Sequence, residues 1–349
     1  MRRFWHTASG FWSAGRGLAW SLITFLAICV VLQLLVQYRL NLWNRDFFNA
    51  LEARNSGQLR HQAYLLPAFA AASVLLAVSA VWGRMTFQRR WREWLTRRLT
   101  KRWLARDNYR RLDADEPEPQ LAEYRIAEDA RVATDAPIDL AVGLLSSTLT
   151  AATFVAVLWN VGGSFDLTPH GIDFVLPGYL VICSLAYGGF ANGAMMLVGR
   201  NMARVIERKN QAESQFKFIL SHVREKGAGG PGPRRVAPIA YSLGEVLRQW
   251  RRLCGQHMRT TLVSHGHTLL APLVGLVVCV PKYIDGSMML GEVTQAAAAF
   301  AAVQGAFNWL VDNYPRLAEW ASSAARVGNL LLALDRIDAK AGSPQPLPA

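Results

Sequence analysis

Charged residues and cysteines are both scarce in this sequence. Aspartate, glutamate, lysine and arginine make up 18% of the 349 residues, whereas apolar residues make up 52%. The four cysteines, at positions 29, 183, 254 and 279, lie far apart and form no CxxC pair. This spacing excludes a disulfide framework of closely spaced cysteines and a cysteine-based metal site. The shortage of charge argues against a pair of ordinary soluble domains.

Sequence signals of nucleotide hydrolysis and of catalysis are also missing from these residues. No GxxxxGK[ST] phosphate loop occurs, and the glycines at 227–232 lack the Lys and Ser/Thr that would hold phosphate and Mg²⁺. His265 and His267 are two positions apart, so they do not share a helix face and do not indicate a metal site. No nucleophile and base form a catalytic pattern. We expect neither an enzyme nor a cofactor.

Long apolar runs dominate the rest of the sequence. A helix needs about 20 mostly apolar residues to cross a bilayer. Six runs approach or exceed this length: residues 18–38, 62–83, 140–163, 174–199, 260–280 and 293–311. We therefore predict an all-α membrane protein with six transmembrane helices over residues 18–335. The basic, aromatic residues 1–17 are expected to form an amphipathic elbow on the lipid bilayer, and residues 336–349 a disordered tail.

Basic residues are distributed unevenly between the two sides of the predicted membrane domain. With a cytoplasmic N-terminus, 33 of the 38 lysines and arginines fall on the inner side, in segments 1–17, 84–137, 199–261 and 312–349. Such asymmetry is typical of cytoplasmic loops. The net charge of +13 is therefore read as a topology signal, and nucleic acid is not expected as a partner. We predict that both termini are cytoplasmic.

The two long inner connections differ in their helical signals. Trp91, Leu95 and Leu99 recur at helical spacing and indicate that the second span continues as a basic helix. This helix is expected either to remain solvated or to dock on another part of the chain. In the other connection, residues 227–238 are rich in glycine and proline, so we expect a break in the helix there.

The last apolar run contains hydrogen-bonding groups that lipid cannot satisfy. Within "GEVTQAAAAFAAVQGAFNWLVDNY" (291–314), steps of three and four residues place Glu292, Gln295, Trp309 and Asn313 on one narrow face, with alanines between them. Two interpretations stay open. The face is a packing seam, where small residues allow close approach and polar residues hydrogen-bond between helices. Alternatively, it lines a cavity in which Glu292 carries a proton.

Other acidic residues give weaker signals. Asp139 is a second candidate for proton coupling or cavity lining, although it and Asp312 are equally well explained as residues at helix ends. Glu128 and Asp129 lie in "RIAEDAR" and are expected to bridge basic residues of a neighbouring helix.

Three stretches resemble one transporter family. They are "LNLWNRDFFNALEARN" (40–55), "YRIAEDARVAT" (124–134) and "LGEVTQAAAAFAAVQGAFNWLVDNYPRLAEWASSAARV" (290–327). Together they are similar to the membrane domain shared by SbmA/BacA-like transporters, YddA-type fused ABC transporters and peroxisomal fatty-acid half-transporters. The resemblance covers residues 20–335 and implies the ABC-exporter (type 1) transmembrane fold, with long cytoplasmic helical extensions. It also implies a homodimer in the bacterial inner membrane.

The resemblance implies transport but leaves the energy source open. Members that lack an ATPase domain import peptides and other bulky solutes down the proton gradient, whereas fused members are ATP-driven. The resemblance also assigns Arg125, Glu128, Asp129 and Glu225 to cytoplasmic conformational coupling. After Glu225, however, "EKGAGGPGPRRVAPIAYSLGE" replaces the family's acidic helical stretch, which weakens the ATP-coupled interpretation.

Three hypotheses about function therefore remain open. The chain is a proton-coupled importer of peptide-like or bulky solutes, which follows from the missing phosphate loop. Alternatively, it is the permease half of an ABC transporter with a separate ATP-binding subunit. The third hypothesis is a membrane scaffold that does not transport.

Overall fold

The computed structural model describes residues 2–14, 16–115, 121–166, 175–225 and 233–342. These residues are almost entirely helical. The elements are α1 (Arg2–Ala14), α2 (Arg16–Glu52), α3 (Ser56–Leu104), the 3-10 turn η1 (Ala105–Asp107), α4 (Asn108–Asp115), α5 (Leu121–Tyr124), the π-helical turn η2 (Arg125–Asp129), α6 (Ala130–Gly162), β1 (Ser164–Asp166), β2 (Val175–Pro177), α7 (Tyr179–Gly199), α8 (Met202–Glu225), α9 (Pro233–Ile284) and α10 (Leu290–Gly342).

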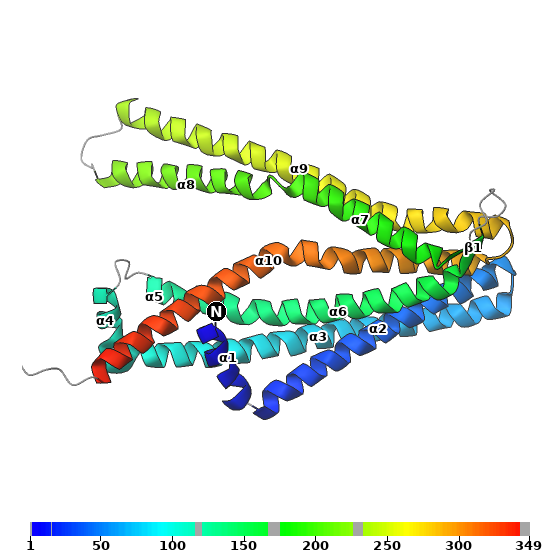
Figure 1. Ribbon diagram of the computed structural model, residues 1–349, viewed down its shortest axis with the longest axis horizontal. Coiled ribbons are helices and arrows are strands. Elements are labelled where there is room, and N and C mark those ends of the chain that lie inside the picture. The colour runs from blue at the N-terminus through cyan, green and yellow to red at the C-terminus, as the bar shows by residue number, and fades with distance from the viewer. Residues whose placement is uncertain (1, 15, 116–120, 167–174, 226–232, 343–349) are drawn as a thin grey trace, which may run out of the picture.

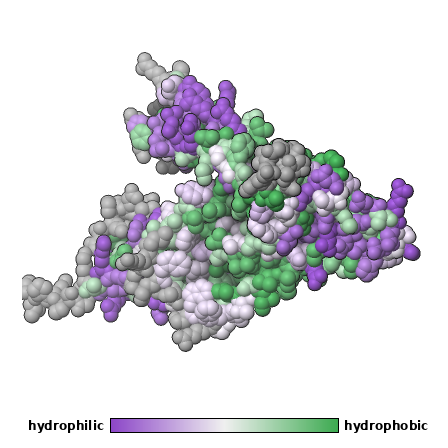
Figure 2. Space-filling view, turned by 45° about the vertical axis from the view of Figure 1, so that its right-hand side comes forward, coloured by the Kyte–Doolittle hydropathy of each residue, from purple (hydrophilic) through white to green (hydrophobic). Residues whose placement is uncertain are grey.

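The long helices converge at one end of the molecule and separate at the other (Figure 1). The converging end carries β1, β2 and the turn between α9 and α10, and we call it the sheet end. At the opposite, splayed end, α8 and α9 run together and diverge from α10, α3 and α4. Hydrophobic surface gathers in the middle of the molecule and hydrophilic surface at its extremities (Figure 2). This distribution suits a protein that crosses a bilayer.

Five helical stretches are long and apolar enough to cross a membrane: 17–52, 56–112, 122–162, 179–223 and 237–284. They contain or largely overlap the first five predicted spans. The sixth predicted span, 293–311, lies in α10, which is not one of these five stretches and runs beside the others (Figure 1). None of the residues in the most apolar window of α3 is buried. That apolar but uncovered surface is the expected property of a helix that faces lipid.

The fourth predicted span begins later than expected. Residues 175–177 form strand β2, which pairs antiparallel with β1, and α7 begins only at Tyr179. Gly178 has a left-handed φ of 63°, a conformation that ends regular structure and that glycine adopts at little cost. A Cβ atom there would lie 2.4 Å from the Trp159 ring, so the backbone also needs glycine to fit beside α6.

Two further helix boundaries, the start of α9 and the end of α10, differ from those predicted. Helix α9 begins at Pro233 and contains Pro238, so the second half of the glycine- and proline-rich stretch is helical, while 226–232 lie outside the described residues. Proline is tolerated near a helix start because the first N–H groups have no intrahelical acceptor. Residues 336–342, expected in a disordered tail, continue α10. The remaining residues, 343–349, lie outside the described part.

Two apolar clusters hold the helices together. One, near the splayed end, joins α1, α3, α6 and α10, and Trp91, Leu95 and Leu99 of α3 are at most 1% exposed within it. The basic extension of α3 is therefore docked, not solvated. Phe11 of α1 stacks on Trp91 with centroids 6.2 Å apart, which attaches the elbow to α3. The second cluster, near the sheet end, joins α6, α7, α9 and α10 around Phe300.

Candidate functional site along helix α10

Polar side chains along α10 reach a different neighbour at each level of the bundle. Gln295 contacts α2, Gln304 contacts α7, Arg316 contacts α6 and Arg326 contacts η2. Hydrogen bonds of this kind hold membrane helices together. The polar residues of the last span therefore serve, first of all, as contacts between α10 and the helices around it.

At the sheet end, α10 is joined to α2 by amide groups and by one carboxylate, that of Glu52. The Asn41 amide donates to the backbone oxygen of Gln295 and the Gln295 amide donates to Asn41 Oδ1, each at 3.1 Å. The Gly291 N–H donates to Asn49 Oδ1 at 2.8 Å. A Cβ on Gly291 would lie 2.0 Å from the Arg45 carbonyl oxygen, so only glycine permits this approach. Two stretches that carried the family resemblance thus contact each other.

Glu292 occupies the first turn of α10. Its Oε2 accepts a hydrogen bond from the Met289 N–H at 3.0 Å, which is the arrangement of a capping box. Glu52 of α2 accepts from the next free N–H, that of Leu290, at 3.1 Å. Lys282, at the end of α9, donates to the Gly162 carbonyl at 2.6 Å. The geometry gives Glu292 a structural task at the helix start, and proton coupling through it stays a prediction.

Halfway along the bundle, α10 packs closely on α7 and α6. The Gln304 amide donates to the Ser184 carbonyl and hydroxyl at 2.8 and 2.9 Å. The Trp309 indole covers Gly143 of α6 so closely that a Cβ there would lie 2.6 Å from the ring. The Asn313 amide donates to the Trp309 carbonyl at 2.8 Å, within α10. Trp309 therefore belongs to the contact with α6, and Asn313 bonds to the Trp309 backbone within α10.

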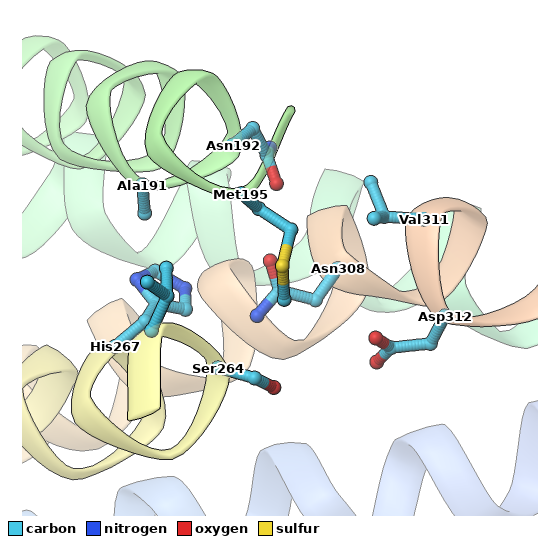
Figure 3. A pocket seen from close by; sticks show the side chains of 9 residues that line it. Ala191, Asn192, Met195, Ser264, His267, Asn308, Val311 and Asp312 are labelled. Atoms are coloured by element: carbon cyan, nitrogen blue, oxygen red, sulfur yellow. The ribbon is translucent and has the colours of Figure 1, made fainter. Parts of the chain in front are cut away.

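A small polar pocket lies between α7, α9 and α10. Its volume is about 10 Å³, enough for about one water molecule. It is lined by Ala191, Asn192, Met195, Val263, Ser264, His267, Asn308, Val311 and Asp312. Figure 3 shows the His267 ring and the Asp312 carboxylate on opposite sides, with Asn308 and Met195 between them. Neither His267 nitrogen has a hydrogen-bond partner among the described residues.

Asp139 joins three helices at the inner ends of the predicted spans. It accepts a hydrogen bond from the Gln88 amide of α3 at 2.7 Å. It also pairs with Arg84 of α3 at 3.2 Å and with Arg316 of α10. Two guanidinium groups hold the carboxylate in place. Asp139 is thus an ion-pair centre between helices, and its assignment to proton coupling stays a prediction.

The "RIAED" motif forms the π-helical turn η2, and π-helical turns are frequent at functional sites. Asp129, whose side chain is 2% exposed, accepts two hydrogen bonds from Arg326 of α10, at 2.8 and 2.6 Å. This is the bridge to a neighbouring helix that the sequence indicated. Glu128 instead pairs with Arg131 of α6, at 2.5 Å, and its pKa is lowered, chiefly by that hydrogen bond.

Two other residues assigned to conformational coupling give less information. Arg125 begins η2. Glu225 ends α8, and its side chain lies outside the described part of the chain. Their role in coupling therefore stays a prediction.

A further ion-pair cluster joins the last turns of α10 to α3 and α4. Arg102 donates to Asp335 at 2.8 Å and to Asp338 at 2.7 Å. Asn108, at the start of α4, donates to Asp338 at 3.1 Å. The hydrogen bond from Arg102 is the main reason that the pKa of Asp338 is lowered. This cluster was not predicted, because residues 336–349, which include Asp338, were expected to form a disordered tail.

The predicted stripe of α10 reaches more than one neighbouring helix. Glu292 and Gln295 lie at the sheet end, whereas Trp309 lies against Gly143 of α6. The assignment of these residues to a cavity stays a prediction. The polar pocket was missed because its members come from three different spans. The only sequence signals were isolated polar residues, such as Asn192 and Ser264, inside otherwise apolar runs.

These observations define a polytopic helical membrane protein whose last long helix is bound to its neighbours by polar contacts. Residues 13–284 match the family described as ABC transporter transmembrane region 2. Because this match covers most of the chain, the protein belongs to that family.

Several curated proteins are similar to most of the chain. The Escherichia coli K12 inner membrane ABC transporter ATP-binding protein YddA is 24% identical over 91% of this chain and 58% of its own length. An uncharacterized ABC transporter ATP-binding protein of Haemophilus influenzae is 22% identical over 97% of this chain and 57% of its own. The chloroplastic ABC transporter D family member 2 of Arabidopsis thaliana is 22% identical over 82% and 39%. The chain thus spans little more than half the length of the first two.

Proposed function

We propose that two copies of this chain form a transporter for peptide-like or other bulky solutes in the bacterial inner membrane. The transporter works by alternating access, is driven by the proton gradient and has both termini in the cytoplasm. The observation that carries the proposal is that α8 and α9 separate from α10 at the splayed end, while the helices converge at the opposite, sheet end (Figure 1). A transporter that opens to one side at a time has this form.

The closed end is held by groups that can separate at modest cost. Asn41, Asn49 and Gln295 are uncharged, and hydrogen bonds between membrane helices average about 0.6 kcal/mol in double-mutant cycles. A bulky solute would separate α10 from α2 if its binding free energy favoured the outward-open state by more than the cost of breaking these few hydrogen bonds. In this proposal the structure is the inward-open member of the pair, since the basic residues of the splayed end favour a cytoplasmic position.

Apolar residues exposed on α8 and α9 support a dimer. These two helices are attached to each other, for example by the Trp250 indole, which donates to Glu213 at 3.0 Å. Their apolar side chains nevertheless stay uncovered: Phe218, Tyr241 and Met258 are 69%, 73% and 72% exposed. A second copy would cover part of this surface, whereas lipid covers the part inside the bilayer.

The names of two relatives favour a second candidate for the energy source. Both are called ATP-binding proteins and both are longer than this chain. In that alternative, the chain is the permease half of an ABC transporter and ATP is bound by a separate subunit. Solute movement would then require nucleotide and the partner, not a pH gradient.

Uptake by reconstituted vesicles tests the proposal. A labelled peptide is offered to proteoliposomes that contain only this chain, with an imposed pH gradient and no nucleotide. Gradient-dependent uptake would support the proton-coupled transporter, with empty liposomes and gradient-free vesicles as controls. Uptake that appears only after an ATP-binding subunit and ATP are added would reject proton coupling in favour of the ABC permease.

A further inference from the structure

We propose that His267 is the proton-binding residue of the transporter, and that its protonation draws α9 toward Asp312 of α10. The inference rests on the proton-coupled form of the proposed function and adds a site to it. The site is the polar pocket between α7, α9 and α10, and the ligand is a proton.

The His267 ring lies in an unusual environment. The residue is 7% exposed and lies inside the predicted span 260–280. Its ring stacks on Tyr187 of α7, with centroids 4.9 Å apart and planes 20° apart. The Tyr187 hydroxyl donates to the His267 backbone carbonyl at 3.0 Å. The ring is thus fixed in position while neither nitrogen has a partner among the described residues.

A buried polar group without a partner is costly, by about 1 to 3 kcal/mol. A chain keeps such a group where its bonding changes during function. A pocket of about 10 Å³ adjoins the ring, and a water molecule there could carry a proton to it. Binding a proton converts the neutral ring into an imidazolium with two N–H donors.

Few titratable groups surround the His267 ring. Within the described residues, the titratable groups that face His267 are Tyr187 on α7 and Asp312 on α10. The Asp312 carboxylate points into the pocket from the far side (Figure 3). Asp312 is itself exposed on α10, whereas His267 is buried, and an imidazolium on the buried side of the pocket would attract its carboxylate. Asn308, which lies between them, can bond to both groups.

The pocket lies between a closed and an open part of the helix bundle. Toward the sheet end, Gln304 ties α10 to Ser184 of α7. Toward the splayed end, α10 is uncovered: Tyr314 is 67% exposed, and α8 and α9 diverge from it (Figure 1). The pocket therefore lies where the two groups of helices begin to separate. A force applied there changes the opening of the whole splayed end.

Helices α7 and α9 can transmit that force together. The Gln256 amide of α9 donates to the Val198 carbonyl at the end of α7, at 2.5 Å. A proton on His267 stabilises the closed arrangement, in which Asp312 is near. By linkage, the closed arrangement then binds the proton more tightly than the open one. This is the requirement for coupling proton movement to alternating access.

The test measures the opening of the splayed end against pH in the full chain. Spin labels are attached to the native Cys254, which is exposed on α9, and to Glu319→Cys on the exposed part of α10. The cysteines at 29, 183 and 279 are replaced by alanine. The protein is placed in lipid nanodiscs and diluted with unlabelled copies, so that distances within one protomer are measured by pulsed electron resonance from pH 5 to 8.5.

We expect the label separation to decrease as the pH falls, with a midpoint in the range where histidine titrates. His267→Gln should abolish the change. The matched control is His265→Gln, since His265 is exposed on the same helix, and it should leave the change intact. Asp312→Asn should move the midpoint to lower pH, because the imidazolium loses its neighbouring anion. This last variant keeps the test valid if His267→Gln does not fold.

A separation that is independent of pH, or that titrates unchanged in both His267→Gln and Asp312→Asn, would overturn the proposal. The outcomes also separate this site from the proposed function. Gradient-driven uptake that persists in His267→Gln would retain the transporter and reject the site. A His267-dependent change of separation without gradient-driven uptake would retain the site and reject proton-coupled transport.

Discussion

The two ends of α10 are fixed by different chemistry. At the sheet end, the contacts with α2 through Asn41 and Asn49 join uncharged groups. At the splayed end, Arg326 and Asp338 of α10 form ion pairs with Asp129 and Arg102. Uncharged bonds can break without leaving a charge in lipid, whereas ion pairs hold best outside it. In the proposed transporter, the sheet end is therefore the end that opens, while the inner half of α10 stays attached to α3, α4 and η2.

Removing the Arg326 guanidinium should give the largest loss of stability. Arg326→Ala leaves the Asp129 carboxylate, whose side chain is 2% exposed, without its bidentate partner. Because the Arg326 side chain is 44% exposed, the cost should lie below the about 3 to 5 kcal/mol of a fully buried pair and above the cost of breaking a surface pair. We expect a clear fall in the thermal unfolding temperature of the detergent-solubilised protein, measured by tryptophan fluorescence.

Arg336→Ala is the matched control for this substitution, because Arg336 is exposed on the same helix. It should change the unfolding temperature little. Equal losses in the two variants would show that the Asp129 pair does not fix the inner half of α10.

At the sheet end, a single added methyl group should disturb the junction. Gly291→Ala places a Cβ 2.0 Å from the Arg45 carbonyl oxygen, which forces α10 away from α2. Overpacking of this kind costs about 1 to 3 kcal/mol. Gly305→Ala, where a Cβ would meet nothing within 4 Å, is the control and should not destabilise the protein. If the sheet end opens in transport, Gly291→Ala should also make the outer half of α10 more accessible to cysteine-directed reagents.

Much of the architecture followed from the sequence because lipid imposes long apolar helices, and residues such as Trp91 and Leu95 repeat at helical spacing. The start of α7 did not follow, because Gly178 and the strand pairing of residues 175–177 depend on contact with Trp159. The end of α10 did not follow either, because the helix is supported by Arg102 from distant α3.

The site was less predictable than the fold. The bond between Asp129 and another helix was anticipated, since the acidic pair in "RIAEDAR" was expected to bridge basic residues of a neighbouring helix. Gln295 was recognised as polar, but its partner Asn41 lies 254 positions away in the sequence. His267 and Asp312 were each noted alone, and helical periodicity within one segment gives no information about a pocket formed by three segments.

A double-mutant cycle at the sheet end should give a smaller effect. It measures how much hydrogen bonding between α2 and α10 contributes to stability there. Asn41→Leu removes both hydrogen bonds between the two residues, whereas Gln295→Leu removes only the bond that the Gln295 side chain donates, because Asn41 donates to the Gln295 backbone oxygen. The coupling energy between them should be about 0.6 kcal/mol, the average for bonds between membrane helices. It is obtained from the unfolding free energies of the two single variants, the double variant and the parent. A coupling near zero would mean that close packing, and not hydrogen bonding, holds the sheet end.

The smallest effect should appear at acid pH at the opposite end of α10. Its bond with Arg102 lowers the pKa of Asp338 below the unfolded value of about 3.9. The pair therefore contributes its full stability above that unfolded value, and the contribution is lost as the pH falls through the lower folded-state pKa. Both side chains are partly exposed, at 27% and 39%, so the gain is small. Asp338→Asn should reduce the unfolding temperature at pH 7 and make it less sensitive to acid below pH 4, whereas Asp285→Asn at the exposed turn before α10 should follow the parent curve. If the parent and Asp338→Asn lose stability in parallel down to pH 3, the splayed end is held by its apolar cluster and not by this ion pair, and the contrast between the two ends of α10 would rest on Asp129 and Arg326 alone.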